Sequence, residues 1–267
     1  MSIIISVTNQ KGGCGKTTTT INLSAVLASK GYKVLAVDID HQADLTKVLG
    51  DEDQQYNFHC GSLIDDSKLD INKCIYNAVY NDKTIKNLSF IPSHISLSRV
   101  VEQSSMKAHK EKILYKHLIK VKDNYDYIFF DCPPNLSLGF MNAVYLSDHF
   151  LIPVDGGKFA LDGMSDLLEA ISEVKEVAIN EINYHVFRNE YAVNNKLINE
   201  FIDNELCNIK GNILNSKIRR SEAVGQASVT SMPLNCYVKS SKSIDDYDKL
   251  CEELLDIIEI QNNTKVL

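Results

Sequence analysis

Apolar and polar residues follow two alternating patterns along the chain. Short runs rich in β-branched and aromatic residues predict buried strands, whereas apolar residues spaced three and four positions apart predict helices. The strand-like runs are 3–7, 33–38, 88–92, 125–131, 149–154 and 184–187, and the run 88–92 is the weakest of them. The helix-like segments are 19–27, 111–122, 162–177, 194–206 and 243–260. Residues 51–110, which are rich in Asn, Asp and Ser, have the least legible pattern.

The alternation of strands and helices predicts an α/β fold. Such an order places the strands in one doubly wound, mostly parallel sheet with helices on both faces. A chain of 267 residues is long enough for one large domain, and its length would also allow two. Because no repeat, low-complexity tract or linker interrupts the pattern, we expect a single domain over residues 1–267.

Composition, charge and cysteine usage narrow the class of protein. The net charge of −7 argues against a generally basic nucleic-acid binder, but it leaves room for a local basic patch. Seven scattered cysteines without a C-x-x-C pair indicate free thiols in a reducing cytosol, not a disulfide framework or a metal–sulfur site. No apolar run approaches the roughly 20 residues of a membrane span. We therefore expect a cytoplasmic protein that is not inserted in a membrane.

Residues 10–18, Gln-Lys-Gly-Gly-Cys-Gly-Lys-Thr-Thr, form the most informative motif. They follow a predicted strand and open a predicted helix, which is the context of a phosphate-binding loop. Glycines allow backbone N–H groups to converge on an anion, and the helix N-terminus adds unpaired donors. In this arrangement Lys16 reaches the β- and γ-phosphates, and the Thr17 hydroxyl binds Mg²⁺. The expected nucleotide-binding residues are Lys11, Gly12, Gly13, Cys14, Gly15, Lys16, Thr17 and Thr18.

The loop departs from the common pattern G-x-x-x-x-G-K-[ST] at two positions. Gln10 stands where the first glycine is expected, and a second lysine, Lys11, precedes the two glycines. A loop this tight leaves Lys11 free to point toward another subunit. The form K-G-G-x-G-K-[ST] resembles the deviant Walker A box of the ParA/MinD family of ATPases. This resemblance implies that Lys11 and Lys16 are catalytic and that Lys11 enters the partner's nucleotide site in an ATP-dependent homodimer.

Two acidic segments complete the expected site. Residues 37–46, Val-Asp-Ile-Asp-His-Gln-Ala-Asp-Leu-Thr, resemble the family's switch I box D-x-D-P-Q-[AG]-x-x-T. The match implies that Asp40 orients the attacking water and that Asp38 supports the metal site, although an aspartate-rich turn is the simpler alternative. His41 replaces the family's proline, and we assign it no catalytic role. The run 129–134 ends a hydrophobic strand in Asp131, the Walker B arrangement that holds Mg²⁺.

Further boxes support the same resemblance and the choice of nucleotide. Residues 151–154 and 159–163 resemble the family's strand and following helix at the dimer face. The guanine-reading motif N-K-x-D does not occur in the sequence, so we expect ATP with Mg²⁺ and not GTP.

Charge changes sign between residues 205 and 242, where six basic residues accompany two acidic ones. Residues 219–223, Arg-Arg-Ser-Glu-Ala, resemble the family's R-L-S-E-A box, which implies that Arg219 contacts DNA phosphates without reading sequence. Arg220 would be an extra cation, and Lys196 and Lys217 would extend the patch. Such binding depends strongly on salt. The alternatives are a solvated basic loop, or a loop that pairs with the acidic C-terminal helix.

The resemblance as a whole implies a ParA-like partition ATPase. It would bind non-specific DNA as an ATP-dependent dimer in the nucleoid-associated cytoplasm, and a ParB-like partner would stimulate its hydrolysis. No helix-turn-helix precedes the loop, so we do not expect a site-specific repressor. A MinD-like membrane ATPase is disfavoured because residues 244–267 carry seven acidic side chains and two lysines. A cargo-positioning ATPase or a nucleotide-gated scaffold with little turnover stays open.

Overall fold

The strands form one mixed sheet in the computed structural model, which describes residues 2–156 and 163–264. Within these residues the sheet has eight strands in the order β3-β4-β2-β5-β1-β6-β7-β8. All neighbouring strands pair in parallel except β3 and β4, which are antiparallel. The strands are β1 Ile3–Val7, β2 Val34–Asp38, β3 Tyr76–Tyr80, β4 Lys83–Ile91, β5 Tyr127–Asp131, β6 His149–Val154, β7 Tyr184–Tyr191 and β8 Ile213–Arg219. The predicted α/β fold with a mostly parallel sheet is confirmed.

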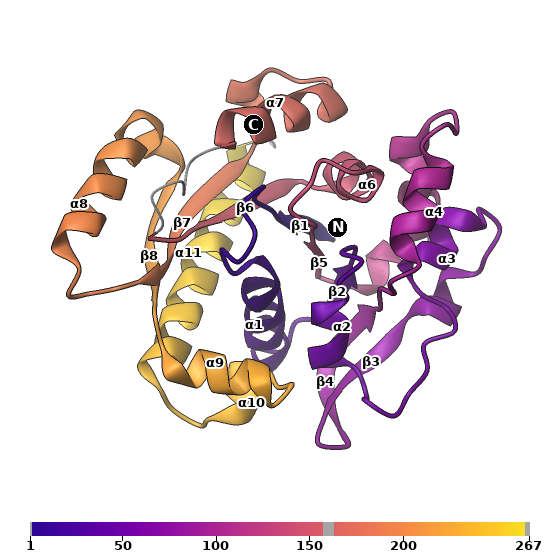
Figure 1. The fold of residues 1–267 in the computed structure, drawn as a ribbon, viewed down its shortest axis with the longest axis horizontal. Coiled ribbons are helices and arrows are strands. Elements are labelled where there is room, and N and C mark those ends of the chain that lie inside the picture. The colour runs from indigo at the N-terminus through magenta and orange to yellow at the C-terminus, as the bar shows by residue number, and fades with distance from the viewer. Residues whose placement is uncertain (1, 157–162, 265–267) are drawn as a thin grey trace.

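Helices cover both faces of this sheet (Figure 1). One face packs against α1 Lys16–Ser29, α2 Asp44–Leu49, α9 Glu222–Val229, α10 Leu234–Tyr237 and α11 Lys242–Thr264. The other face packs against α3 Cys60–Asp65, α4 Leu97–Ser104, α5 Ile113–Leu118, α6 Leu138–Leu146, α7 Met164–Lys175 and α8 Lys196–Glu205. Short 3₁₀ turns are η1 Ile71–Cys74, η2 Lys110–Lys112, η3 Lys122–Asn124, η4 Ile179–Glu181 and η5 Leu206–Asn212.

The central strands are buried on both faces because each side of the sheet has its own hydrophobic core. Along β5, Phe130 packs toward the α3–α8 side and Phe129 toward α1 and α11. Successive side chains of a strand point to opposite faces, so a strand covered on both sides must be apolar throughout. This is why the runs 125–131 and 149–154 read as strands without polar alternation.

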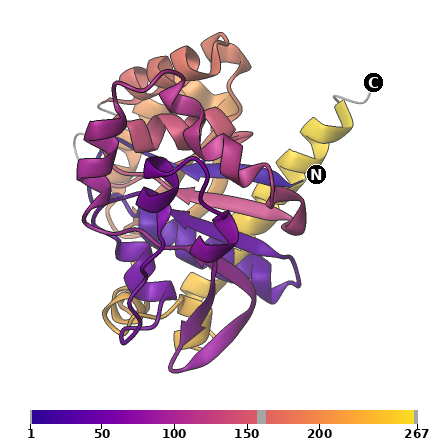
Figure 2. The same ribbon diagram turned by 90° about the vertical axis from the view of Figure 1, so that its right-hand side faces the viewer.

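Several elements differ from the sequence prediction. Residues 213–219 form the edge strand β8 and not a loop, and the weak run 88–92 is the end of the longer strand β4. β8 escaped notice because only Leu214 and Ile218 are buried along it. The predicted helix 111–122 is broken into η2, α5 and η3, whereas α11 is longer than expected and projects from the body of the molecule (Figure 2). The predicted box 159–163 falls largely on residues 157–162, which lie outside the described residues.

Among the helices in the described part of the chain, none is both long and apolar enough to cross a bilayer.

The sheet brings the predicted acidic residues to one edge. Asp38 ends β2 and Asp131 ends β5, and the two residues are direct partners in the parallel register. Val7, which ends β1 just before the glycine-rich loop, also pairs with Asp131. Ligands of open α/β sheets bind at the carboxyl ends of the strands. The loop and both carboxylates therefore face the same crevice.

Candidate functional site

The glycine-rich loop connects β1 to α1 through two left-handed backbone positions. Gly13 has φ +73° and Gly15 has φ +90°, which L side chains rarely adopt. A Cβ on Gly15 would also clash with the side-chain amide of Asn189. Asn189 is buried at the end of β7, and its Nδ2 donates a 2.8 Å hydrogen bond to the backbone carbonyl of Cys14. The loop conformation therefore depends on glycine at position 15 and on a side chain from β7.

The two lysines of the loop have different surroundings. Lys16 is buried at the start of α1, and its Nζ donates to the backbone carbonyl of Lys11 at 2.9 Å. The Nζ of Lys11 lies 2.6 Å and 2.8 Å from the two carboxylate oxygens of Asp155, directly after β6. Lys11 is thus not free in the single chain, contrary to the expectation from the loop alone. A loop lysine and a carboxylate 144 residues away meet because β1 and β6 are neighbours.

Asp38 and Asp131 are both fully buried, but their hydrogen bonding differs. Asp38 accepts bonds from the Thr46 backbone N–H at 2.9 Å and from the Thr46 hydroxyl at 2.6 Å. Neither carboxylate oxygen of Asp131 accepts a well-aligned hydrogen bond among the described residues, although the nearby Thr17 hydroxyl acts to lower its pKa. Burial, and next the charge of Asp38, raise the pKa of Asp131 well above its usual range. A buried carboxylate without partners is unusual, because an unpaired buried charge is costly.

These surroundings fit a divalent cation. Mg²⁺ prefers hard oxygen ligands and is commonly held by one or two carboxylates with substrate phosphates. The orphaned Asp131 carboxylate supplies such a ligand, with Asp38 beside it in the register and Thr17 in the first turn of α1. Within the described residues no cluster of three His, Cys, Asp or Glu side chains forms a protein-only metal site.

Asp40 lies just beyond the end of β2, in the turn that leads to α2. Its backbone N–H donates to Asp38 at 3.2 Å, and its carboxylate accepts the backbone N–H of Gln42 at 3.0 Å. The Nδ1 of His41 lies 3.4 Å from the same carboxylate. The Asp40 side chain is only 15% exposed. A partly buried carboxylate held by its own turn is well placed to hold a water molecule near the crevice.

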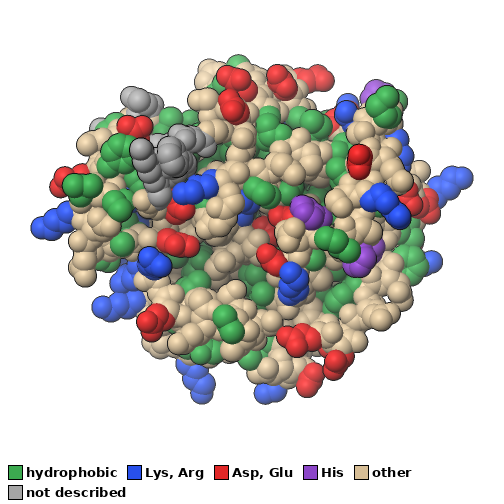
Figure 3. Space-filling view, in the orientation of Figure 1, with side chains coloured by type: hydrophobic (Ala, Val, Ile, Leu, Met, Phe, Trp, Pro, Cys, Tyr) green, Lys and Arg blue, Asp and Glu red, His purple; other side chains and the backbone are tan. Residues whose placement is uncertain are grey.

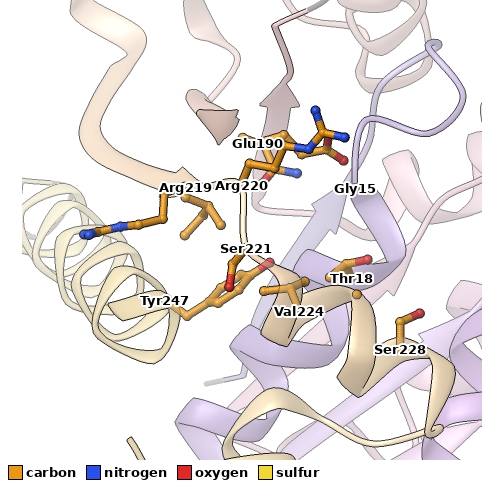
Figure 4. A pocket seen from close by; sticks show the side chains of 12 residues that line it. Gly15, Thr18, Glu190, Arg219, Arg220, Ser221, Val224, Ser228 and Tyr247 are labelled. Carbon is orange, nitrogen blue, oxygen red and sulfur yellow. The ribbon is translucent and has the colours of Figure 1, made fainter. Parts of the chain in front are cut away.

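A cavity of about 300 Å³ opens beside the loop (Figure 4). It is bounded by Gly15 and Thr18 at the start of α1, by Asn189 and Glu190 at the end of β7, and by Arg220 after β8. Its size lies at the lower end of the range for small-molecule sites. Sequence reasoning missed the β7 residues, because a lone Asn-Glu pair after a buried strand has no recognisable signature.

The four predicted DNA contacts have different environments. Arg219 forms a two-pronged ion pair with Asp246 of α11, in which both N···O distances are 2.6 Å. This is the pairing with the acidic C-terminal helix that the sequence left open. The Nζ of Lys217 lies 3.8 Å from Asp203 and over the ring of Tyr191.

The other two cations have no such partners. Lys196 and Arg220 are exposed, and neither has a salt bridge within residues 2–156 and 163–264. Basic and acidic side chains are interspersed along the α8 and β8 side of the face in Figure 3. The four residues do not gather into one uninterrupted positive patch.

Comparison with known proteins gives a consistent result. A family model described as an AAA domain matches residues 2–184. The chromosome-partitioning ATPase Soj of Treponema pallidum is 31% identical over 248 residues, which are 92% of this chain and 94% of that protein. The sporulation initiation inhibitor protein Soj of Bacillus subtilis is 40% identical over 185 residues, which cover 66% of this chain and 67% of that protein.

A solved structure has the same fold over nearly its whole length. It is a putative plasmid partition protein from Borrelia burgdorferi bound to AMPPNP. It aligns with a TM-score of 0.80 at 25% sequence identity, covering 96% of this chain and 99% of that one. The similarity extends beyond the loop to the C-terminal strands and helices.

Proposed function

The chain belongs to the ParA/MinD family of partition ATPases, and we propose that Mg-ATP closes it into a sandwich dimer that binds DNA without sequence preference. It is a P-loop ATPase that uses ATP and Mg²⁺. The observation that carries the Mg-ATP part of the proposal is the buried Asp131 carboxylate, which accepts no well-aligned hydrogen bond in the described residues and lies beside Asp38 and Thr17 at the loop. A phosphate-bound cation would supply the missing positive charge.

Each residue around the crevice has a separate role in phosphoryl transfer. Loop N–H groups hold the phosphates, and the Lys16 ammonium neutralises charge on the β- and γ-phosphates once it leaves the Lys11 carbonyl. Thr17 and Asp131, with support from Asp38, would hold Mg²⁺, which would supply positive charge next to the phosphate oxygens. Asp40 orients the attacking water. Phosphoryl transfer needs mainly positioning and charge neutralisation, so one such carboxylate is sufficient.

The cavity beside the loop takes the nucleoside. A nucleotide whose phosphates lie on the loop must extend past Gly15 and Thr18, and both residues border the cavity. The buried Tyr247 also lines it, so that the cavity offers an aromatic surface next to polar side chains. Clefts with mixed linings of this kind are typical of small-molecule sites.

Dimerisation requires Lys11 to exchange partners. In the single chain its ammonium is neutralised by Asp155. We propose that in the ATP-bound dimer the ammonium leaves Asp155 and contacts the phosphates of the other subunit. The pair is partly exposed, with side-chain exposures of 26% and 17%, so breaking it costs little.

The DNA surface is proposed on the α8 and β8 side of the molecule. Lys196 is the accessible cation there, Lys217 lies on the edge strand, and Arg219 contributes when DNA phosphates displace Asp246. Binding of this kind neutralises phosphates and weakens steeply with salt. A ParB-like partner that stimulates hydrolysis would release the dimer from DNA.

The hydrolytic mechanism is tested by Asp40→Ala. We expect this variant to bind Mg-ATP and to lose DNA-stimulated hydrolysis, because water orientation and not nucleotide affinity depends on Asp40. Asp44→Asn, in the same segment but outside the expected catalytic set, is the control. Unchanged hydrolysis by Asp40→Ala would favour the second candidate function, a nucleotide-gated scaffold with little turnover.

A further inference from the structure

Two adjacent arginines at the end of β8 point in opposite directions (Figure 4). The Arg219 side chain extends toward α11, where it pairs with Asp246. The Arg220 side chain extends the other way, toward the loop that carries Gly15. Neighbouring residues of an extended segment alternate in direction. The arginine doublet is therefore divided between two surroundings and does not form one basic patch.

The backbone fixes the direction of Arg220. Its N–H donates a 3.1 Å hydrogen bond to the carbonyl of Tyr191, which joins the end of β8 to the end of β7. Tyr191 pairs with Arg219 in the parallel register, so this contact continues the sheet by one residue. The start of α9, at Glu222, then turns the chain away. Arg220 thus stands on the rim of the nucleoside cavity, on rigid elements.

The Arg220 guanidinium has no carboxylate partner there. Among the described residues it lies within salt-bridge distance of none, although Glu190 borders the same cavity. Glu190 itself has φ +50°, a left-handed conformation that costs energy for a residue with a Cβ. An acidic and a basic side chain therefore face one cavity without neutralising each other directly, which leaves the guanidinium available to a ligand.

We propose that Arg220 is a nucleotide-binding residue, whose guanidinium covers the base of the nucleotide held by the loop of the same subunit. The inference rests on the proposed function, because it takes the cavity as the nucleoside site. A planar guanidinium stacks on aromatic faces and is more weakly hydrated than an ammonium, so an arginine suits this position better than a lysine. In this proposal Arg220 belongs to the nucleotide site and not to the DNA surface.

The test is a fluorescence titration of the full-length protein with mant-ATP and mant-ADP in the presence of Mg²⁺. Arg220→Ala should raise both dissociation constants by about 5- to 30-fold, the range for losing a partly desolvated cation–π contact. Arg220→Lys, which keeps the charge without the plane, should fall between Arg220→Ala and the wild type. Arg99→Ala, at an exposed arginine on α4 away from the cavity, is the matched control and should leave both constants unchanged. Circular dichroism checks that each variant is folded.

Three outcomes would overturn the assignment. The first is unchanged affinity of Arg220→Ala for both nucleotides while Lys16→Ala abolishes binding. The second is a loss confined to ATP, which would place the guanidinium at the γ-phosphate. The third is loss of DNA binding by Arg220→Ala at saturating ATP without any change in nucleotide affinity. Failure of the wild type to bind either nucleotide would instead contradict the proposed function.

Discussion

Lys11 and Asp155 form a two-pronged ion pair within one chain, with Nζ–oxygen distances of 2.6 Å and 2.8 Å. The pair joins the glycine-rich loop after β1 to the end of β6, so it holds the loop against the sheet. In the proposed dimer the same ammonium is needed by the partner's phosphates. On the proposed function, this contact has to open before the dimer can close.

Asp155→Asn should strengthen the ATP-dependent dimer. Removing the carboxylate charge releases Lys11, and a partly exposed pair is worth at most about 1 kcal/mol, so we expect about fivefold tighter association. Sedimentation velocity with a non-hydrolysable ATP analogue measures the effect. Asp166→Asn, an exposed carboxylate on α7, controls for the change in net charge. A weaker dimer in Asp155→Asn would mean that Asp155 acts in the dimer and not against it.

Asp246→Asn should tighten DNA binding. The substitution frees the Arg219 guanidinium from its two 2.6 Å contacts and makes it available to phosphates. We expect the slope of log DNA affinity against log salt concentration to become steeper by about one, because one more phosphate contact releases about one more counterion. The measurement is fluorescence anisotropy with non-specific duplex DNA and ATP over a series of salt concentrations. The neighbouring exposed Asp245, changed to Asn, is the control, and equal slopes for the two variants would remove Arg219 from the DNA surface.

Stability should fall in mild acid because of a buried histidine pair. The Nδ1 of His149 and Nε2 of His185 lie 3.2 Å apart beneath α11, and burial followed by the proximity of His149 lowers the pKa of His185 to about 4, partly opposed by Glu253. His185 is therefore neutral in the folded chain, and an unfolded histidine titrates near 6.5. The neutral His185 therefore stabilises the folded chain fully above pH 6.5. As the pH falls toward 4, the free energy of unfolding decreases by up to about 3 kcal/mol, because the unfolded histidine takes up a proton that the folded one does not.

Urea unfolding at several pH values between 4 and 7 measures this loss. His185→Gln should flatten the dependence on pH in that window, whereas His94→Gln, at an exposed position, should not. If the wild type and His185→Gln lose stability in parallel, other groups must carry the acid sensitivity.

The sequence predicts those site residues that belong to one short motif. Gly13, Gly15 and Lys16 lie in one short run between a strand and a helix, and the required backbone conformations are those of glycine. Asp131 was found because it ends a fully apolar strand. Asp155 and Asn189 were missed, since each reaches the loop only through the order of strands, which no short sequence window contains.

The fold class is predicted correctly, but individual elements were missed where their residues are not apolar. The edge strand β8 buries only Leu214 and Ile218, with the polar run Asn-Ser-Lys between them, so it shows neither an apolar run nor a period of two. The hairpin of β3 and β4 turns at Asn81 and Asp82, both with positive φ, a two-residue turn that favours hairpins. An Asn-Asp pair is typical of such a turn, but it lies in the polar stretch 51–110, whose composition does not predict flanking strands.

The most direct test of the account is the mass of the protein in solution with Mg-ATP when hydrolysis is blocked by Asp40→Ala. Sedimentation equilibrium should give a monomer of 30.0 kDa without nucleotide and a species of twice that mass with Mg-ATP. Adding Lys11→Ala should abolish the dimer and leave nucleotide binding intact. A chain that binds Mg-ATP yet stays monomeric, or that dimerises equally well without Lys11, would contradict the central claim.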